Sequence, residues 1–235
     1  MQDTAFRQRF FSNVRHSKDS VIGSLDDDHA TQDCEYLVEL AANAAHIASN
    51  IRIENTGHRC DSHWFNTFPG EHYRILAGLL VELKPKNIID IGTHTGMSSR
   101  IMLDFSSAKV DTFDIIHWKN LSTHLTEEDF ESRLTQHLID LSIEAEFDQH
   151  IDMIDNANLI FCDAPKDGVF EYEFLDLLSN TELDQQERYL VLDDIKFLNM
   201  APLWRRIASP KFDLTSFGHW SGTGIVDISN GLILS

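Results

Sequence analysis

Short apolar runs alternate with helix-like segments along most of this chain, and this alternation limits the fold more than any other feature. Four runs, at 87–91, 109–115, 158–162 and 189–193, have the length and composition of buried strands. Strands separated by helices pair in parallel, and the helices then cover both faces of the sheet. We therefore predict a doubly wound, Rossmann-like α/β domain.

The predicted helices are less certain in their bounds than the strands. Apolar residues recur at three- and four-residue steps from Cys34 to Ala48 and again from Ile75 to Leu83, where Pro85 follows. Segment 143–157 has no clear period, so we place only a short strand there. Further helices are predicted near 97–105, 127–141, 170–179 and 200–208.

The two ends of the sequence depart from the alternating pattern. Residues 1–30 are polar, without a sustained apolar period, which predicts a loosely ordered arm. Near the other end, 212–217 and 224–228 are joined by a short glycine-containing turn, which predicts an antiparallel hairpin. We expect seven strands with the last pair antiparallel, an arm and helical cap over 1–69, and the main domain over 70–235.

Composition excludes several classes of partner. The formal charge of −19 repels phosphate backbones, so nucleic acid is not an expected partner. No apolar stretch is long enough to span a bilayer, so no membrane partner is expected. The odd set Cys34, Cys60 and Cys162 is typical of reduced thiols, which predicts a cytoplasmic protein.

A glycine-containing turn follows the first predicted strand. Asp90 ends the apolar run, and Gly92, Thr93 and Gly96 lead into the next helix. Such a turn lets backbone amides approach a ligand closely at a helix N-terminus, as nucleotide-type sites require. A bare pattern of this kind is equally typical of an ordinary tight turn, so the candidate cofactor-binding role of these residues needs support from elsewhere.

That support comes about twenty residues further on, where Asp114 ends the second predicted strand. An acid at this place in doubly wound folds accepts hydrogen bonds from the two ribose hydroxyls of a nucleotide. Asp111 is the weaker choice because it lies inside the strand. The turn and Asp114 together predict a site for a ribose-containing cofactor.

With these residues the chain resembles the class I methyltransferase superfamily, whose first motif is a glycine turn preceded by an acid and whose second is an acid ending strand two. The resemblance covers roughly residues 70–235 and includes the terminal hairpin. The triplet Thr93-His94-Thr95 replaces a further glycine and is similar to the form found in small-molecule O-methyltransferases. The resemblance to this superfamily implies that the cofactor is S-adenosylmethionine.

A second group of polar residues follows two other strands. Asp163 and Lys166 follow the run at 158–162, and Asp193 and Asp194 end the run at 189–193. Adjacent parallel strands present their carboxyl ends to the same crevice, and hard oxygen donors suit Mg²⁺ or Ca²⁺. Successive strand residues point to opposite faces, so Asp193 and Asp194 can share one ion only where the strand has already ended.

This second group is similar to that of metal-dependent O-methyltransferases of the catechol and macrocin type. The resemblance implies that Asp163, Asp193 and Asp194 hold Mg²⁺, that Asp163 also contacts the cofactor, and that Asp163 and Lys166 are catalytic. Lys166 would take the proton of the acceptor hydroxyl or stabilise its alkoxide. An ion pair of Lys166 with Asp167 or Glu171 is the structural alternative.

The expected reaction is methyl transfer from S-adenosylmethionine to a hydroxyl of a small molecule. Two alternative functions remain open. One is a Rossmann-like enzyme of another class, hydroxylase-like or nicotinamide-dependent, because a fold does not fix its chemistry. The other is a non-catalytic protein that keeps the cofactor pocket. The sequence identifies neither the acceptor nor the oligomeric state, and a homodimer is left open.

Overall fold

The computed structural model describes residues 34–54, 62–67, 70–121, 123–197, 199–218 and 220–235. The predicted arm over 1–30 and Cys60 lie outside these residues. Within them, Cys34 and Cys162 are both buried, and no disulfide joins them.

One seven-stranded sheet forms the centre of the molecule, with strand order β3-β2-β1-β4-β5-β7-β6. The first five strands of the chain pair in parallel, and β7 is antiparallel to both of its neighbours. This order and the reversed β7 confirm the predicted fold class. The strands are β1 (Asn87–Ile91), β2 (Lys109–Phe113), β3 (Leu134–His137), β4 (Leu159–Cys162), β5 (Tyr189–Asp193), β6 (Lys211–Asp213) and β7 (Thr223–Asp227).

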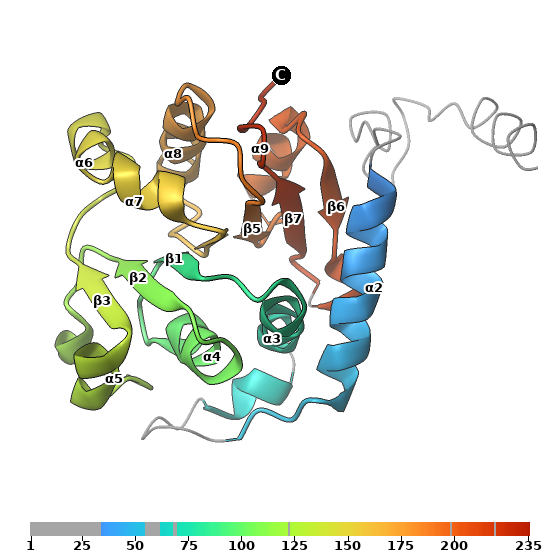
Figure 1. The fold of residues 1–235 in the computed structure, drawn as a ribbon, viewed down its shortest axis with the longest axis vertical. Coiled ribbons are helices and arrows are strands. Elements are labelled where there is room, and N and C mark those ends of the chain that lie inside the picture. The colour runs from blue at the N-terminus through green and yellow to red at the C-terminus, as the bar shows by residue number, and fades with distance from the viewer. Residues whose placement is uncertain (1–33, 55–61, 68–69, 122, 198, 219) are drawn as a thin grey trace, which may run out of the picture.

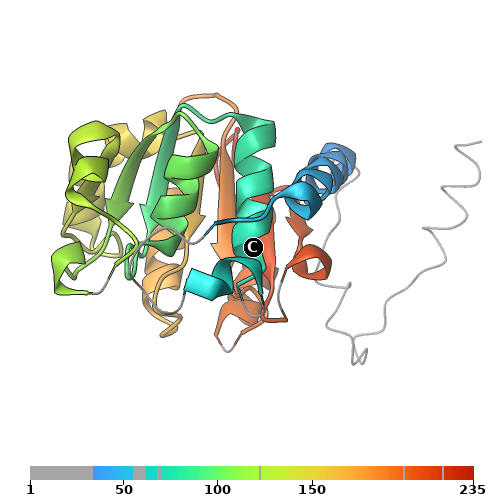
Figure 2. The same ribbon diagram turned by 90° about the horizontal axis from the view of Figure 1, so that it is seen from below.

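Helices cover the two faces of the sheet, as a doubly wound fold requires. Figure 1 shows α2, α3, α4 and α5 on one side and α6, α7, α8 and α9 on the other, and Figure 2 shows α3 and α4 in front of the strands. The helices on the first side are α2 (Glu35–Asn50), α3 (His72–Leu83), α4 (Met97–Phe105) and α5 (Glu127–Ser132). Those on the second are α6 (Glu144–Gln149), α7 (Ile151–Asn156), α8 (Phe170–Ser179) and α9 (Met200–Arg206), and the 3₁₀ turns are η2 (Ser62–Asn66), η3 (Trp118–Asn120) and η4 (Thr215–Phe217).

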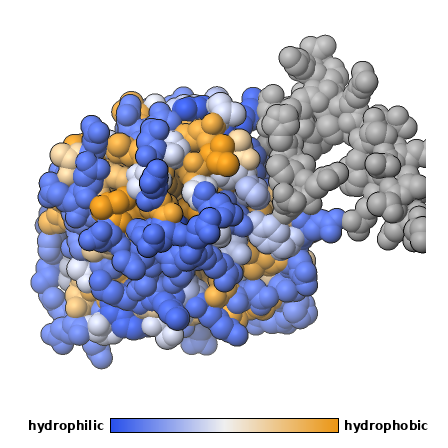
Figure 3. Space-filling view, turned by 45° about the horizontal axis from the view of Figure 1, so that its top comes forward, coloured by the Kyte–Doolittle hydropathy of each residue, from blue (hydrophilic) through white to orange (hydrophobic). Residues whose placement is uncertain are grey.

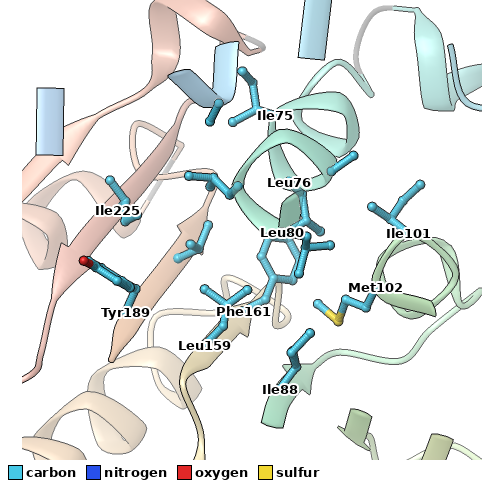
Figure 4. Packing of buried hydrophobic residues seen from close by; sticks show 14 of the residues in the cluster. Ile75, Leu76, Leu80, Ile88, Ile101, Met102, Leu159, Phe161, Tyr189 and Ile225 are labelled. Carbon is cyan, nitrogen blue, oxygen red and sulfur yellow. The ribbon is translucent and has the colours of Figure 1, made fainter. Parts of the chain in front are cut away.

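Each side of the sheet has its own apolar core. Buried side chains of α2, α3 and α4 pack on one face of the sheet, and those of α6 to α9 pack on the other. In the first core, residues of α3, α4 and four strands point into a common space, as Figure 4 shows for Ile75, Leu76, Leu80, Ile88, Ile101, Met102, Leu159, Phe161, Tyr189 and Ile225. Burial on both faces explains why the central strands are continuous apolar runs.

Hydrophilic residues predominate on the face of the molecule shown in Figure 3, and they separate smaller hydrophobic groups from one another. Within the part of the chain that the structure describes, none of the helices combines the length and apolar character needed to cross a bilayer.

Two sequence predictions are wrong. The helix predicted over 127–141 ends at Ser132, because the chain then enters β3, an edge strand of four residues in which only Leu134 is fully buried. The short strand predicted within 143–157 is instead α6 and α7, whose short turns bury only Phe147 and Ile154. The other elements hold, with β2 and β6 shorter than expected and 215–217 in a 3₁₀ turn.

Candidate active site

The glycine turn after β1 passes directly over the end of β4. Gly92 has φ = 103°, and a Cβ there would lie 2.3 Å from the carbonyl oxygen of Asp163. Its N–H donates to the carbonyl oxygen of Phe113, at 2.9 Å, and Gly96 begins α4 with φ = 80°. Only glycine fits at residue 92, because any side chain would meet both backbone strain and a backbone atom.

Asp90 lies beneath this turn and is fully buried. Its Oδ2 accepts hydrogen bonds from the hydroxyls of Ser98, Ser99 and Thr112, so it fastens α4 and β2 to β1. Burial raises the pKa of Asp90 to about 7, although the three hydroxyls oppose that shift. Oδ1 has no hydrogen-bond partner among the described residues. Asp90 therefore braces the site from below through side chains rather than through the loop amides.

The remaining predicted cofactor residues divide into two kinds. The hydroxyl of Thr93 is buried and lies 2.7 Å from that of Thr112, which directs it into the sheet. Asp114, by contrast, is half-exposed and accepts backbone N–H groups from His94 and Ile116, both at 2.8 Å. Asp114 thus joins the glycine turn to the loop after β2 and keeps further lone pairs for a ligand.

A cavity of about 490 Å³ opens between this turn, the loops after β2 and β3, and the loop after β4. Of the predicted cofactor residues, Gly92, Asp114 and Asp163 line it, whereas Asp90, Thr93 and Gly96 lie outside its lining. Asp111 is also outside, since it is buried in ion pairs with Lys109 and His137. Most of the other lining side chains are apolar, including Ile115, Ile116, Ile139, Leu141, Ala164, Pro165 and Phe170.

The loop after β4 holds Lys166 in an unusual backbone conformation. Lys166 has φ = 55°, and its backbone N–H donates to Oε1 of Glu171 at 2.7 Å. Its side chain is buried, and Nζ contacts Oδ1 of Asp163 and lies 3.5 Å from Oδ2 of Asp194. Neither Asp167 nor Glu171 forms the ion pair considered as the alternative: Asp167 accepts the N–H groups that begin α8. Lys166 is thereby directed at the predicted acidic group.

The two aspartates after β5 face different partners. Asp193 is the last residue of β5, is buried and accepts a hydrogen bond from the hydroxyl of Thr223 at 3.0 Å. Asp194 follows with φ = 59°, so the strand has ended there and strict alternation no longer applies. Its carboxylate lies on the Lys166 side.

The structure brings a histidine to this group that the sequence prediction did not include. One ligand atom each of His72, Asp163 and Asp193 lies within 4.8 Å of the others, whereas Asp194 is outside this set. His72 is the first residue of α3, and it is buried beside the loop of Gly218. In the sequence, His72 lies only a few residues before the apolar period that begins at Ile75. That position did not predict that its imidazole would lie near the strand ends.

The local charge is strongly unbalanced. Three carboxylates, of Asp163, Asp193 and Asp194, surround one ammonium group, that of Lys166. Burial alone would lower the pKa of Lys166, but these carboxylates outweigh it and raise that pKa above its ordinary range. The remaining negative charge is what a divalent cation would offset, and the donor set of carboxylate oxygens and one imidazole nitrogen fits such an ion.

The fold and site together define a doubly wound α/β protein with a ligand cavity at the carboxyl ends of its strands, which is where such folds bind ligands. The reversed β7, which the resemblance to class I methyltransferases implies, is antiparallel to both β5 and β6. The described part of the chain has four non-glycine residues with positive φ, and three of them, His94, Lys166 and Asp194, gather at this edge. Backbone strain of that kind is typical of functional sites.

Comparison with known proteins gives likeness at the level of fold. No protein-family model matches the sequence, and no curated protein is significantly similar to it. The SAH-bound methyltransferase PaMTH1 of Podospora anserina aligns over 96% of this chain and 95% of its own, with 14% identity and a TM-score of 0.44. A methyltransferase from Geobacter sulfurreducens aligns over 99% and 98%, with 14% identity and a TM-score of 0.46. At this level, the likenesses by themselves support no statement about the reaction of this chain.

Proposed function

We propose that this chain transfers a methyl group from S-adenosylmethionine to a hydroxyl group of a small molecule, with the help of a divalent cation. The observation that carries the proposal is the position of Asp163. Its side chain lines the cavity and also belongs to the group with His72 and Asp193. A methyl donor in the cavity and an acceptor at the cation would therefore meet at one residue.

The cavity suits the adenosyl part of the cofactor in size and chemistry. Its volume lies within the roughly 300–1,000 Å³ common for small-molecule sites. The apolar side chains of Ile116, Leu141 and Phe170 would cover a flat ring, and the carboxylate of Asp114 would accept the ribose hydroxyls. When bound, S-adenosylmethionine supplies the electrophilic methyl group.

The carboxylate group suits the acceptor half of the reaction. Asp163 and Asp193, with Asp194 nearby, would hold the cation, which on binding would lower the pKa of the acceptor hydroxyl and fix its position. Lys166, held against Asp163 and Asp194, presents an ammonium group that would stabilise the alkoxide formed when the acceptor hydroxyl loses its proton to solvent, and methyl transfer would then release S-adenosylhomocysteine. Most of the rate enhancement would then come from positioning.

The same site favours a small, hydroxylated acceptor over a polyanion. With a formal charge of −19 and a site rich in carboxylates, the protein would repel a nucleic acid. A homodimer is compatible with the proposal, and sedimentation would test it directly.

Titration calorimetry of S-adenosylmethionine with the parent protein and Asp114→Asn tests the proposal. We expect the parent to bind, and Asp114→Asn to bind at least about tenfold more weakly, because an amide NH₂ replaces one of the two carboxylate oxygens and the charge that strengthens the ribose hydrogen bonds is lost. Glu131→Gln, which removes one exposed charge of α5, is the matched control and should bind like the parent. Binding of NADH in place of S-adenosylmethionine, or equal affinity of parent and Asp114→Asn, would overturn the proposal. Mass spectrometry of reactions with catechols and sugars then reports the methylated product.

A further inference from the structure

We infer that the cation site of this chain includes an imidazole ligand, that of His72, and selects a divalent first-row transition-metal ion over Mg²⁺. The inference deepens the proposed function and rests on it for the role of the ion. Binding of the metal itself can be measured without any methyl transfer. His72 would join Asp163 and Asp193 as a protein ligand, with Asp194 outside the coordination sphere.

The first support is geometry. The ligand atoms of His72, Asp163 and Asp193 lie within 4.8 Å of one another, so a point exists within about 2.8 Å of all three. Metal–ligand bonds are about 2.2 Å long, so each atom would move inward by about 0.6 Å at most to bind one ion. Three protein ligands leave positions open for acceptor oxygens, as in catalytic metal sites.

The second support is the rigidity of the elements that carry two of these ligands. His72 begins α3 and is 7% exposed, and Asp193 ends β5 and is 3% exposed. The hydroxyl of Thr223 on β7 fixes the orientation of the Asp193 carboxylate. Ligands held by a helix, a strand and a neighbouring hydroxyl are already arranged before the ion arrives.

The position of Asp194 is the third support. Its carboxylate lies 3.5 Å from Nζ of Lys166, and its backbone has left the extended conformation of β5. Asp163 and Asp194 both contact the ammonium group of Lys166, but of the two only Asp163 belongs to the group of ligand atoms with His72 and Asp193. His72 therefore occupies the place of a third ligand beside Asp163 and Asp193.

Ligand chemistry then decides which ions fit. Mg²⁺ strongly prefers oxygen ligands and retains water, whereas an imidazole nitrogen suits the later first-row metals. One nitrogen with two carboxylates moves the preference away from Mg²⁺ and toward ions such as Mn²⁺, Fe²⁺ and Co²⁺. The expected order of affinity for this chain is therefore Co²⁺ above Mn²⁺, and Mn²⁺ above Mg²⁺.

The test begins with metal-free protein, prepared by chelation, and titrates Mn²⁺, Co²⁺ and Mg²⁺ by calorimetry. We expect one site that binds Mn²⁺ at least about tenfold more tightly than Mg²⁺. The variant His72→Gln should lose at least about tenfold in Mn²⁺ affinity, because even the loss of an outer partner of a metal ligand costs that much. Asp194→Asn should lower Mn²⁺ affinity by less than His72→Gln does, because it removes a nearby charge but no ligand. The reverse ranking of these two variants would overturn the inference.

A spectroscopic measurement covers the case in which His72→Gln does not fold. Electron spin echo modulation of the Mn²⁺-loaded parent should show coupling to an imidazole ¹⁴N nucleus. Modulation from water protons alone would sink the inference. Failure of the proposed function would give a different result: normal Mn²⁺ binding through His72 with no binding of S-adenosylmethionine.

Discussion

Asp90 provides a test of the electrostatics beneath the site. Burial raises the pKa of Asp90 from its ordinary 3.8 to about 7 in the folded chain. The folded state thus retains a proton on Asp90 at pH values where the unfolded chain has released it. Stability that depends on this carboxyl is complete below about pH 4 and is lost as pH rises toward 7.

The size of the effect follows from proton linkage. While Asp90 is protonated only in the folded state, each pH unit lowers the free energy of unfolding by about 1.4 kcal/mol. Between pH 5.5 and 7 the loss is roughly 2 kcal/mol, and above about pH 7.5 the slope vanishes.

Asp90→Asn is the perturbation that isolates this effect, because it removes the titrating group and keeps a carbonyl oxygen for the hydroxyls of Ser98, Ser99 and Thr112. Urea unfolding, followed by tryptophan fluorescence at half-unit steps from pH 5.5 to 8, gives the free energy of unfolding of both proteins. All other titrating groups are common to the pair and cancel in the difference. We expect the parent to lose stability relative to the variant up to about pH 7 and then to level off. A difference that is constant, or that moves in favour of the parent as pH rises, refutes the burial argument.

Three further predictions concern the turn and the acidic group. Gly92→Ala should lower the free energy of unfolding by about 3 kcal/mol or more, because it adds a collision with a backbone atom to the strain of a positive φ. Gly231→Ala is the control, since residue 231 has φ = 89° and a Cβ there would meet nothing within 4 Å. It should lower the free energy of unfolding by only about 1 kcal/mol in the same urea titration. Thr223→Val should cost about 1–3 kcal/mol by removing the hydroxyl that donates to the buried carboxylate of Asp193, and the loss should appear in thermal unfolding of the metal-free protein. Lys166→Met should raise Mn²⁺ affinity by about tenfold in calorimetry, since a positive charge leaves the cation site; a fall in affinity would show that Lys166 supports the ion.

The sheet was predictable where burial on both faces dictates the residues. β1 and β5 were predicted with their observed bounds because nearly all of their buried positions are apolar, with Asp90 as the exception in β1. β3 was missed because it lies at the sheet edge, where Thr135, Gln136 and His137 face partly outward and leave no apolar run. Its neighbour α5 begins with a capping box at Thr126, which favours a helix. No glycine or proline follows within 127–141 to mark where that helix ends.

The site was predictable where it follows directly from strand ends. Asp114, Asp163, Lys166 and Asp193 all come from loops that a parallel sheet must gather at one edge. His72 could not be found in this way, because its position depends on how α3 packs across the sheet. The orientation of Asp194 likewise depends on a single backbone torsion that no residue pattern encodes.

The reversed strand β7 has a consequence for how the protein is made. β7 lies between β5 and β6 and is the last of the seven strands to be synthesised. Until it emerges from the ribosome, β5 is an open strand edge, which is a template for pairing with other chains. The hydrogen bond from the hydroxyl of Thr223 to the buried carboxylate of Asp193 also cannot form before β7 has been synthesised. A ribosome that stalls before Thr223 would therefore leave a nascent chain that is both prone to aggregate and without a finished site.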